Sequence, residues 1–212
     1  MLASLAVSTL LFLGAYLLGS LPTGYLAGRW LAGVDIRNCG SGSTGATNVA
    51  RAVGNRAAAV VLGVDVLKGI LAVGSVAGAY AVLSPTILPP AWQPWLAAAA
   101  ALGAIIGHSW PVWLGFAGGK SVATGLGVLL TLSPTIALGT SVAFALVVGA
   151  SRIVSLGSLT AVVAAVGLAI MLGEPLPYQL FIGVAGAYVV WRHRGNIARL
   201  LQGTEPRLGQ SR

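Results

Sequence analysis

Residues 69–119 read GILAVGSVAGAYAVLSPTILPPAWQPWLAAAAALGAIIGHSWPVWLGFAGG and contain no Lys, Arg, Asp or Glu. A helix that crosses a membrane needs about 20 consecutive, mostly apolar residues. The middle of the stretch, Ser84–Pro94, holds four prolines and no charge, which is typical of a turn. The stretch therefore predicts two membrane helices joined by a short connection.

The rest of the chain has the same character. Of its 212 residues, 57% are hydrophobic and only 8% are charged, whereas a soluble domain carries about 25% charged residues. The net charge of +8 would suggest nucleic-acid binding in a soluble protein. Too little polar surface is available for that class, so a soluble nucleic-acid-binding module is excluded. Residues 1–212 are expected to form a single polytopic membrane domain.

The uncharged stretches predict seven transmembrane helices in an all-α integral membrane protein. Ser133-Pro134 divides one long stretch, because the residue before a proline is disfavoured in a helix. The fourth helix is short, about 18 Å at about 1.5 Å per residue, so the sequence leaves open whether it spans the membrane fully. The helices are expected near residues 2–27, 57–84, 95–115, 121–132, 134–150, 155–172 and 178–191.

Basic residues fall in alternate connections between these helices. Every Lys and Arg except Lys68 lies in one of four segments. The positive-inside rule places such segments in the cytoplasm, so the N-terminus is expected outside and the C-terminus in the cytoplasm. The expected cytoplasmic segments are residues 29–56, 116–121 and 151–155 and the tail 192–212.

The first cytoplasmic segment contains a run of glycines and hydroxyl side chains. Gly40, Gly42 and Gly45 would let the backbone turn so that several N–H groups face one concavity, which is a binding site for anions. The alternative is a flexible connector. A Walker P-loop is excluded because no Gly-Lys pair follows. The polar residues of the run are Ser41, Ser43, Thr47, Asn48 and Arg51.

A second candidate phosphate loop precedes the fourth helix. Gly118 and Gly119 stand before Lys120, and small residues beside a cation suit a phosphate group. Gly119-Lys120-Ser121 resembles the end of a Walker motif, but the required first glycine is replaced by Leu114. We therefore expect phosphate binding without a nucleotide-binding fold.

Asp65 and Lys68 are ionisable residues inside the second expected membrane helix. At positions i and i+3 they can pair with each other, and charged groups at this depth face the bundle interior or a wet cavity. A structural ion pair is favoured over a catalytic role. His108 lies at a comparable depth in the third helix and is expected to join them.

Further polar residues follow in the later cytoplasmic segments. His193 and Asn196 share a face if the last helix continues, whereas Arg192, Arg194 and Arg199 are expected to be anchors at the membrane surface. The chain has two His and four acidic residues and no His-x4-Asp pattern, so no metal site or cofactor is expected. The remaining candidates are Arg152, Ser155 and Ser158.

Five motifs together resemble the bacterial acyl-phosphate-dependent glycerol-3-phosphate acyltransferases, the PlsY family. The match runs in order along nearly the whole chain, and it departs from the family pattern at Ser43, usually Asn, and at Ser121, usually Gly. The motifs are Gly40-Ser41-Gly42-Ser43-Thr44-Gly45-Ala46-Thr47-Asn48-Val49-x-Arg51, Asp65-x-x-Lys68-Gly69, Gly107-His108-x-x-Pro111 with Gly118-Gly119-Lys120-Ser121-Val122-Ala123-Thr124, Arg152-x-Val154-Ser155-Leu156-x-Ser158, and Arg192-His193-Arg194-x-Asn196-Ile197.

The resemblance implies transfer of a fatty acyl group from acyl phosphate to the 1-hydroxyl of sn-glycerol 3-phosphate, which gives lysophosphatidic acid and phosphate. It implies a multi-pass protein of the bacterial inner membrane with a cytoplasmic active site. The implied partners are the two substrates, membrane lipid and the soluble enzyme that makes acyl phosphate. No nucleic acid is involved.

The resemblance also implies a division of roles among the site residues. Ser41, Thr47 and the loop amides would hold the acyl phosphate. Glycerol 3-phosphate would be bound, and its hydroxyl oriented, by Arg51, Lys120, Ser158, His193 and Asn196. Either His193 or the donor phosphate would accept the proton. The implied catalytic residues are His193, Asn196, Lys120 and Ser158, and the implied substrate-binding residues are Ser41, Gly42, Ser43, Thr47, Asn48, Arg51, Gly118, Gly119, Arg152 and Ser155.

Two other classes of function fit parts of the sequence. A transporter for anions or phosphate esters would use the same basic residues, but alternating access would also need polar groups on the outer half, and none is expected there. A lipid-scrambling or scaffold protein would leave the glycine loop and Lys120 unexplained. The acyltransferase interpretation accounts for both features.

Overall fold

The structure is a computed structural model that describes residues 1–209; the last three residues of the expected tail 192–212 lie outside this range. All regular elements in the described range are helices. They pack as two compact units, the first Met1–Leu132 and the second beginning at Ser133. Each unit is described by itself.

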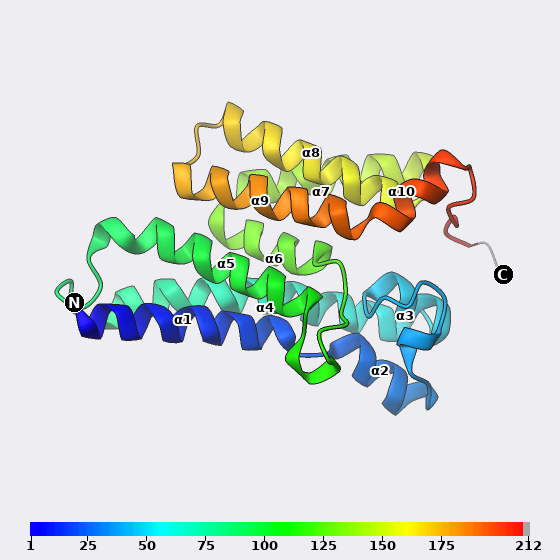
Figure 1. Ribbon diagram of the computed structural model, residues 1–212. Helices are drawn as coiled ribbons and strands as arrows, with labels where there is room; N and C mark the ends of the chain where they lie inside the picture. Colours follow the sequence, from blue (N-terminus) through cyan, green and yellow to red (C-terminus); the bar gives the residue numbers. More distant parts are fainter. Residues whose placement is uncertain (210–212) are drawn as a thin grey trace. The chain divides into compact units, whose positions relative to one another are not determined.

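In the first unit, three long helices run side by side: α1 packs along α5 and α4, and α6 packs on α4 (Figure 1). The short helices α2 and α3 lie at the ends of α1 and α4. The elements are α1 (Leu2–Ser20), α2 (Thr23–Ala32), η1 (Ile36–Asn38), α3 (Ala46–Ala52), α4 (Asn55–Val82), η2 (Pro90–Trp92), α5 (Gln93–Ser109), η3 (Val112–Leu114) and α6 (Val122–Leu132).

Glycines allow the closest helix contacts of the first unit. A Cβ at Gly107 of α5 would overlap the carbonyl oxygen of Tyr16 in α1. A Cβ at Gly127 of α6 would overlap the carbonyl oxygen of Val66 in α4. Small residues that bring helix backbones together are typical of membrane bundles, where dispersion contacts rather than the hydrophobic effect drive helix association.

The second unit is a group of antiparallel helices followed by the tail. α8 packs against both α7 and α9, and α10 follows α9 after a single residue, His193. Ser133 caps α7 by accepting a hydrogen bond from the N–H of Ile136, and Pro134 occupies the first helical position, where no N–H is needed. The elements are α7 (Pro134–Ser151), α8 (Val154–Met171), α9 (Leu176–Arg192) and α10 (Arg194–Leu201).

Each of the seven expected membrane helices is present as a helix, and three boundaries differ. The first expected helix is broken at Leu21-Pro22, because proline supplies no N–H to continue α1. The third ends at Ser109, before Pro111, rather than near residue 115. The expected loop 29–56 contains the end of α2, η1 and all of α3.

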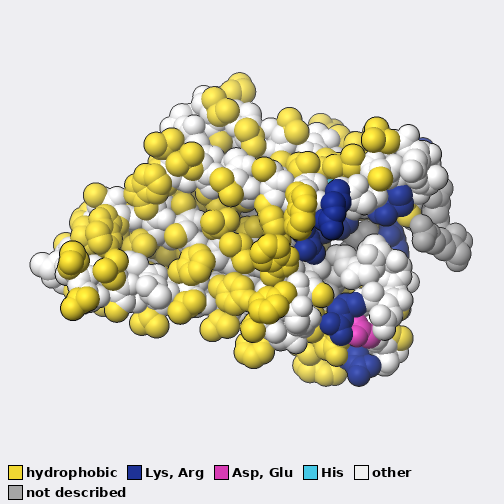
Figure 2. All heavy atoms as spheres, viewed as in Figure 1, with side chains coloured by type: hydrophobic (Ala, Val, Ile, Leu, Met, Phe, Trp, Pro, Cys, Tyr) yellow, Lys and Arg dark blue, Asp and Glu magenta, His cyan; other side chains and the backbone are white. Residues whose placement is uncertain are grey.

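The described helices have the apolar character of an integral membrane protein. Five helical segments are long and apolar enough to cross a membrane, and α6, with 11 residues, is a shorter apolar helix. On the face shown in Figure 2, hydrophobic side chains cover α1 and its neighbours, while Lys and Arg side chains of the first unit gather over the α2–α3 region. The number of spans and the orientation of the termini stay predictions.

Candidate active site

The loop of residues 40–48 is shaped from within by one side chain. Asn48 is 2% exposed. Its Nδ2 donates to the carbonyl oxygens of Ile36, Cys39 and Ser43 at 2.9–3.0 Å, and its Oδ1 accepts a hydrogen bond from the N–H of Ser41 at 3.1 Å. These contacts show that Asn48 holds the loop; substrate binding by Asn48 stays a prediction.

The same loop needs glycine at two positions. Gly40 and Gly42 have φ values of +53° and +69°, in the left-handed region that side-chain-bearing residues rarely adopt. Gly45 has an ordinary φ of −75°. The N–H of Gly42 donates to the carbonyl of Cys39, so it closes the turn and is not directed at a ligand.

Hydroxyls and a cation remain available on this loop. The hydroxyls of Ser41 and Thr47 make no hydrogen bond within residues 1–209. Thr47 and Arg51 are four residues apart on α3 and share a face of that helix, and Arg51 is exposed. These three residues keep the anion-binding character that the sequence predicts, although fewer amides contribute than expected.

The second loop, residues 118–121, lies against the last turn of α5. The N–H of Gly118 donates to the carbonyl of Ser109, and the N–H of Gly119 donates to the carbonyl of His108, both at 3.1 Å. A Cβ at Gly119 would overlap the imidazole of His108. Both glycine amides thus bond within the protein, and Gly119 allows close packing on His108. Substrate binding by Gly118 and Gly119 stays a prediction. Lys120 follows and is half-buried.

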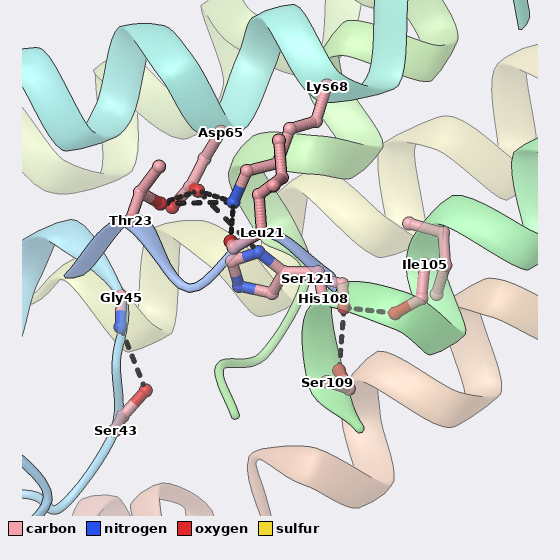
Figure 3. A network of polar contacts seen from close by, with 10 residues as sticks. All are labelled: Leu21, Thr23, Ser43, Gly45, Asp65, Lys68, Ile105, His108, Ser109 and Ser121. Atoms are coloured by element: carbon pink, nitrogen blue, oxygen red, sulfur yellow. Dashed lines mark hydrogen bonds and ion pairs between the residues drawn. The ribbon is translucent and has the colours of Figure 1, made fainter. Parts of the chain in front are cut away.

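Ser121 fixes the end of this loop. Its φ is +62°, a conformation that favours glycine, the residue usual in the family at this position. Its hydroxyl lies 2.7 Å from the carbonyl oxygen of Ile105 and 2.6 Å from the hydroxyl of Ser109. These bonds hold Ser121 in the strained conformation, with both partners on α5 (Figure 3).

A buried group of four side chains, the membrane cluster, lies among α2, α4 and α5. It consists of Thr23, Asp65, Lys68 and His108. The Lys68 ammonium lies 2.6 Å from Asp65 Oδ1, 3.0 Å from Thr23 Oγ1 and 2.5 Å from the carbonyl oxygen of Leu21. Its three N–H donors thus have three acceptors. His108 Nδ1 lies 3.7 Å from Asp65 Oδ1, which confirms that His108 joins the pair (Figure 3).

Arg37 connects η1 with η3 in the first unit. Its guanidinium pairs with Asp35 at 2.7 Å and donates to the carbonyl oxygen of Leu114 at 3.4 Å. The hydrogen bonds from Arg37 lower the pKa of Asp35 to about 2, so this carboxyl group is charged at neutral pH. Arg37 also lies over the ring of Tyr25, 5.1 Å from its centre.

In the second unit, the tail folds back onto α8 and α10 through Glu205. Its carboxylate accepts hydrogen bonds from Ser155 at 2.7 Å, Asn196 at 2.5 Å and Arg199 at 2.7 Å. Burial raises the pKa of Glu205, but these hydrogen bonds outweigh burial and leave the pKa below its ordinary value. We call Ser155, Asn196, Arg199 and Glu205 the tail cluster.

His193 and Ser158 are both buried, and each bonds to a backbone carbonyl oxygen. His193 Nδ1 lies 2.8 Å from the carbonyl oxygen of Val189. A carbonyl oxygen can only accept, so Nδ1 carries the proton and Nε2 is the basic nitrogen of the neutral ring. The Ser158 hydroxyl donates to the carbonyl of Val154 in its own helix.

Residues 9–203 match the sequence profile of a family described as glycerol-3-phosphate acyltransferase. The chain belongs to this glycerol-3-phosphate acyltransferase family. Two relatives agree with that membership. The glycerol-3-phosphate acyltransferase of Crocosphaera subtropica is 56% identical over 96% of this chain and 95% of the relative. That of Synechococcus elongatus is 55% identical over 92% of each chain.

Solved structures of the family agree with the fold. A crystal structure of PlsY (YgiH), an integral membrane glycerol 3-phosphate acyltransferase in its glycerol 3-phosphate form, matches 96% of both chains with a TM-score of 0.86 and 37% identity. The lysophosphatidic acid form matches with a TM-score of 0.82 and 36% identity. As a family member, this chain is an acyltransferase and an integral membrane protein.

In this glycerol-3-phosphate acyltransferase family member, the expected site residues fall into separate groups. The first unit holds one group on the 40–48 loop and α3 and another on the 118–121 loop. In the second unit, Ser155 and Asn196 meet at Glu205, whereas Arg152, at the end of α7, is exposed and its carbonyl oxygen accepts a hydrogen bond from the N–H of Leu208.

Sequence reasoning missed two residues of the tail cluster. Glu205 lies in a tail without periodicity, so nothing in its spacing indicated that it meets Asn196. Arg199 was expected to be only a surface anchor, but it pairs with Glu205 at 2.7 Å. The one available signal was that Glu205 is among only four acidic residues in the chain.

Proposed function

We propose that this chain transfers a fatty acyl group from acyl phosphate to the 1-hydroxyl of sn-glycerol 3-phosphate. The hydroxyl oxygen attacks the acyl carbonyl carbon, the bond from that carbon to the phosphate oxygen breaks, and the hydroxyl proton passes to a base. The products are lysophosphatidic acid and inorganic phosphate. Membership in the glycerol-3-phosphate acyltransferase family supports the acceptor and the product.

The observation that carries the donor assignment is the 40–48 loop with its adjoining helix face. The uncommitted hydroxyls of Ser41 and Thr47 and the exposed Arg51 suit a small phosphate group. An acyl phosphate has a good leaving group, so positioning and charge stabilisation suffice and no covalent acyl-enzyme is needed. Ser41 and Thr47 are therefore proposed to hold the acyl phosphate, and Arg51 and Lys120 are proposed to bind glycerol 3-phosphate.

Each unit also contributes residues that are proposed to act on substrate. Lys120 in the first unit and Ser158, His193 and Asn196 in the second are proposed to orient and activate substrate. The base is either Nε2 of His193 or the phosphate of the donor. A His193→Gln variant that retains most of its turnover would favour the donor phosphate.

The membrane orientation follows from the distribution of charge. Arg29, Arg37 and Arg56 belong to the same segment as the 40–48 loop. By the positive-inside rule this segment faces the cytoplasm, where the soluble enzyme that makes acyl phosphate would deliver the donor. We therefore propose a location in the bacterial inner membrane with a cytoplasmic active site, an external N-terminus and a cytoplasmic C-terminus.

A donor comparison tests the proposed function. Purified full-length protein in lipid nanodiscs is incubated with labelled glycerol 3-phosphate and either palmitoyl phosphate or palmitoyl-CoA, in the presence of EDTA. We expect lysophosphatidic acid from palmitoyl phosphate alone. Turnover with palmitoyl-CoA alone would overturn the donor assignment. Uptake of labelled glycerol 3-phosphate into liposomes without any product would favour the transporter.

A further inference from the structure

The membrane cluster takes no part in the proposed chemistry, although its four polar side chains lie inside the helix bundle. Asp65 and Lys68 are 1% and 2% exposed. Buried charges are costly in a membrane, and well-packed apolar residues usually serve stability as well as a buried ion pair does. What distinguishes this cluster is that His108 contacts the 118–121 loop, while Thr23 adjoins Gly24, which packs on the 40–48 loop.

One connection runs through His108 to the 118–121 loop, here called the Lys120 loop. The side chain of His108 lies 3.7 Å from Asp65, while its carbonyl oxygen accepts the N–H of Gly119. Gly119 in turn packs on the imidazole so closely that a Cβ would not fit. His108 therefore contacts the loop with both its backbone and its ring, one residue before Lys120.

The other connection runs through the start of α2 to the 40–48 loop. Lys68 binds the carbonyl of Leu21 and the hydroxyl of Thr23, on either side of Pro22. The next residue, Gly24, packs on the carbonyl oxygen of Thr44 without room for a Cβ. The position of α2 therefore sets the position of the 40–48 loop.

We propose that the membrane cluster is a positioning device that holds the Lys120 loop and the 40–48 loop in a fixed relation to each other. The proposal rests on the proposed function, because it assigns the two loops to glycerol 3-phosphate and acyl phosphate respectively. Thr23, Asp65, Lys68 and His108 are positioning residues that act through the loops. Their directional hydrogen bonds specify one arrangement, which apolar packing would not do as strictly.

Steady-state kinetics of the full-length protein test this proposal, because damage to each connection should raise KM for a different substrate. His108→Ala is expected to raise KM for glycerol 3-phosphate roughly 10- to 100-fold, the range expected for a displacement of about 1 Å, and to leave KM for palmitoyl phosphate unchanged. Thr23→Val is expected to raise KM for palmitoyl phosphate instead. Ser75→Ala is the matched control, since its hydroxyl bonds only the carbonyl of Ala72 in its own helix.

Two further variants separate positioning from general destabilisation. His108→Asn places an amide nitrogen near the position of Nδ1 and is expected to recover much of the lost affinity for glycerol 3-phosphate. The double variant Asp65→Asn with Lys68→Met removes both charges together, so the fold is kept, and it is expected to raise both KM values.

Unchanged KM values in His108→Ala and in the double variant would overturn the proposal. So would equal rises of both KM values in His108→Ala accompanied by a lower Tm, because that result describes a structural role alone. Wild-type protein that makes no lysophosphatidic acid would instead refute the proposed function. The two failures are therefore distinguishable.

Discussion

The membrane cluster and the tail cluster each surround a buried carboxylate with hydrogen-bonding partners, but their cations differ in exposure. Each gathers polar groups from three elements around one carboxylate, Asp65 in the first and Glu205 in the second. The cation of the first, Lys68, is 2% exposed, whereas that of the second, Arg199, is 36% exposed. Both carboxylates are buried, at 1% exposed for Asp65 and 6% for Glu205, so the clusters differ in whether water can reach the cation.

This difference predicts how much stability each cluster loses when its carboxylate is removed. Removing one member of a buried ion pair leaves an uncompensated charge, which costs about 3–5 kcal/mol. Removing the carboxylate of Glu205 leaves its cation, Arg199, where water can reach it, so the cost approaches that of the lost hydrogen bonds. The experiments below test the contrast from the largest expected effect to the smallest.

The largest effect is expected for Asp65→Ala. The free energy of unfolding should fall by about 3–5 kcal/mol, because Lys68 keeps its charge among apolar helices. Thermal unfolding in one detergent would measure the loss beside that of Glu205→Ala. The added substitution Lys68→Met should recover most of it. Equal losses in the two single variants would show that the clusters do not differ in the way their exposure indicates.

A smaller effect, with a distinct pH dependence, is expected for Glu205→Gln. Hydrogen bonds to a charged group contribute about 1.5–3 kcal/mol, and folding lowers the pKa of Glu205 below its ordinary value of 4.5. A depressed pKa means that the stabilisation is complete above pH 4.5 and is lost as the pH falls through the folded-state pKa.

The free energy of unfolding of Glu205→Gln should therefore lie below that of the wild type at pH 7, and the two values should converge as the pH falls. Glu174→Gln is the matched control, because the carboxylate of Glu174 makes no hydrogen bond within residues 1–209. A difference that stays constant down to pH 3 would contradict the assignment of a charged, hydrogen-bonded Glu205 in the native state.

The 40–48 loop, at the end of one connection from the membrane cluster, provides a matched pair of glycines. Gly42→Ala should destabilise by about 1–2 kcal/mol, the cost of a left-handed conformation, and should lower turnover. Its Cβ would also lie 3.1 Å from the carbonyl oxygen of Arg37. Gly45→Ala should be tolerated, since its φ is −75°. Equal loss of turnover in both would show that space around the loop, rather than conformation, is limiting.

The smallest effect is expected at Ser121, beside the membrane cluster. Ser121→Gly relieves about 1 kcal/mol of backbone strain and loses two hydrogen bonds that contribute about 1 kcal/mol each. The net change in unfolding free energy should stay near 1 kcal/mol, as thermal unfolding would measure. A loss several times larger would mean that the hydroxyl anchors the loop more strongly than its geometry indicates.

The membrane cluster was largely predictable from the sequence, and the tail cluster was not. Hydropathy fixes the depth of a residue in a membrane helix, and helical periodicity places Asp65 beside Lys68. His108 was predicted to join them because it lies at a similar depth in the next membrane helix. Glu205 follows a helix end and reaches Asn196 through a turn, which no periodicity describes. Thr23 was missed because the break at Pro22 turned it toward α4.

The candidate loops show a second limit of sequence reasoning. Glycine spacing correctly indicated a tight turn at Gly42. It could not indicate which amides the protein itself uses, because that depends on carbonyl groups supplied by η1 and α5. The N–H of Gly119, for example, donates to the carbonyl oxygen of His108. The hydroxyls of the 40–48 loop retained the predicted availability.

The bonds of Lys68 have a consequence for the biogenesis of the protein. Asp65 and Lys68 lie on one helix, so these two charges can pair with each other as α4 enters the membrane. The other two acceptors, at Leu21 and Thr23, belong to a segment that the ribosome makes earlier. The ammonium can therefore complete its bonds before α5 is synthesised. His108, on α5, is synthesised last and packs against an ion pair that has already formed.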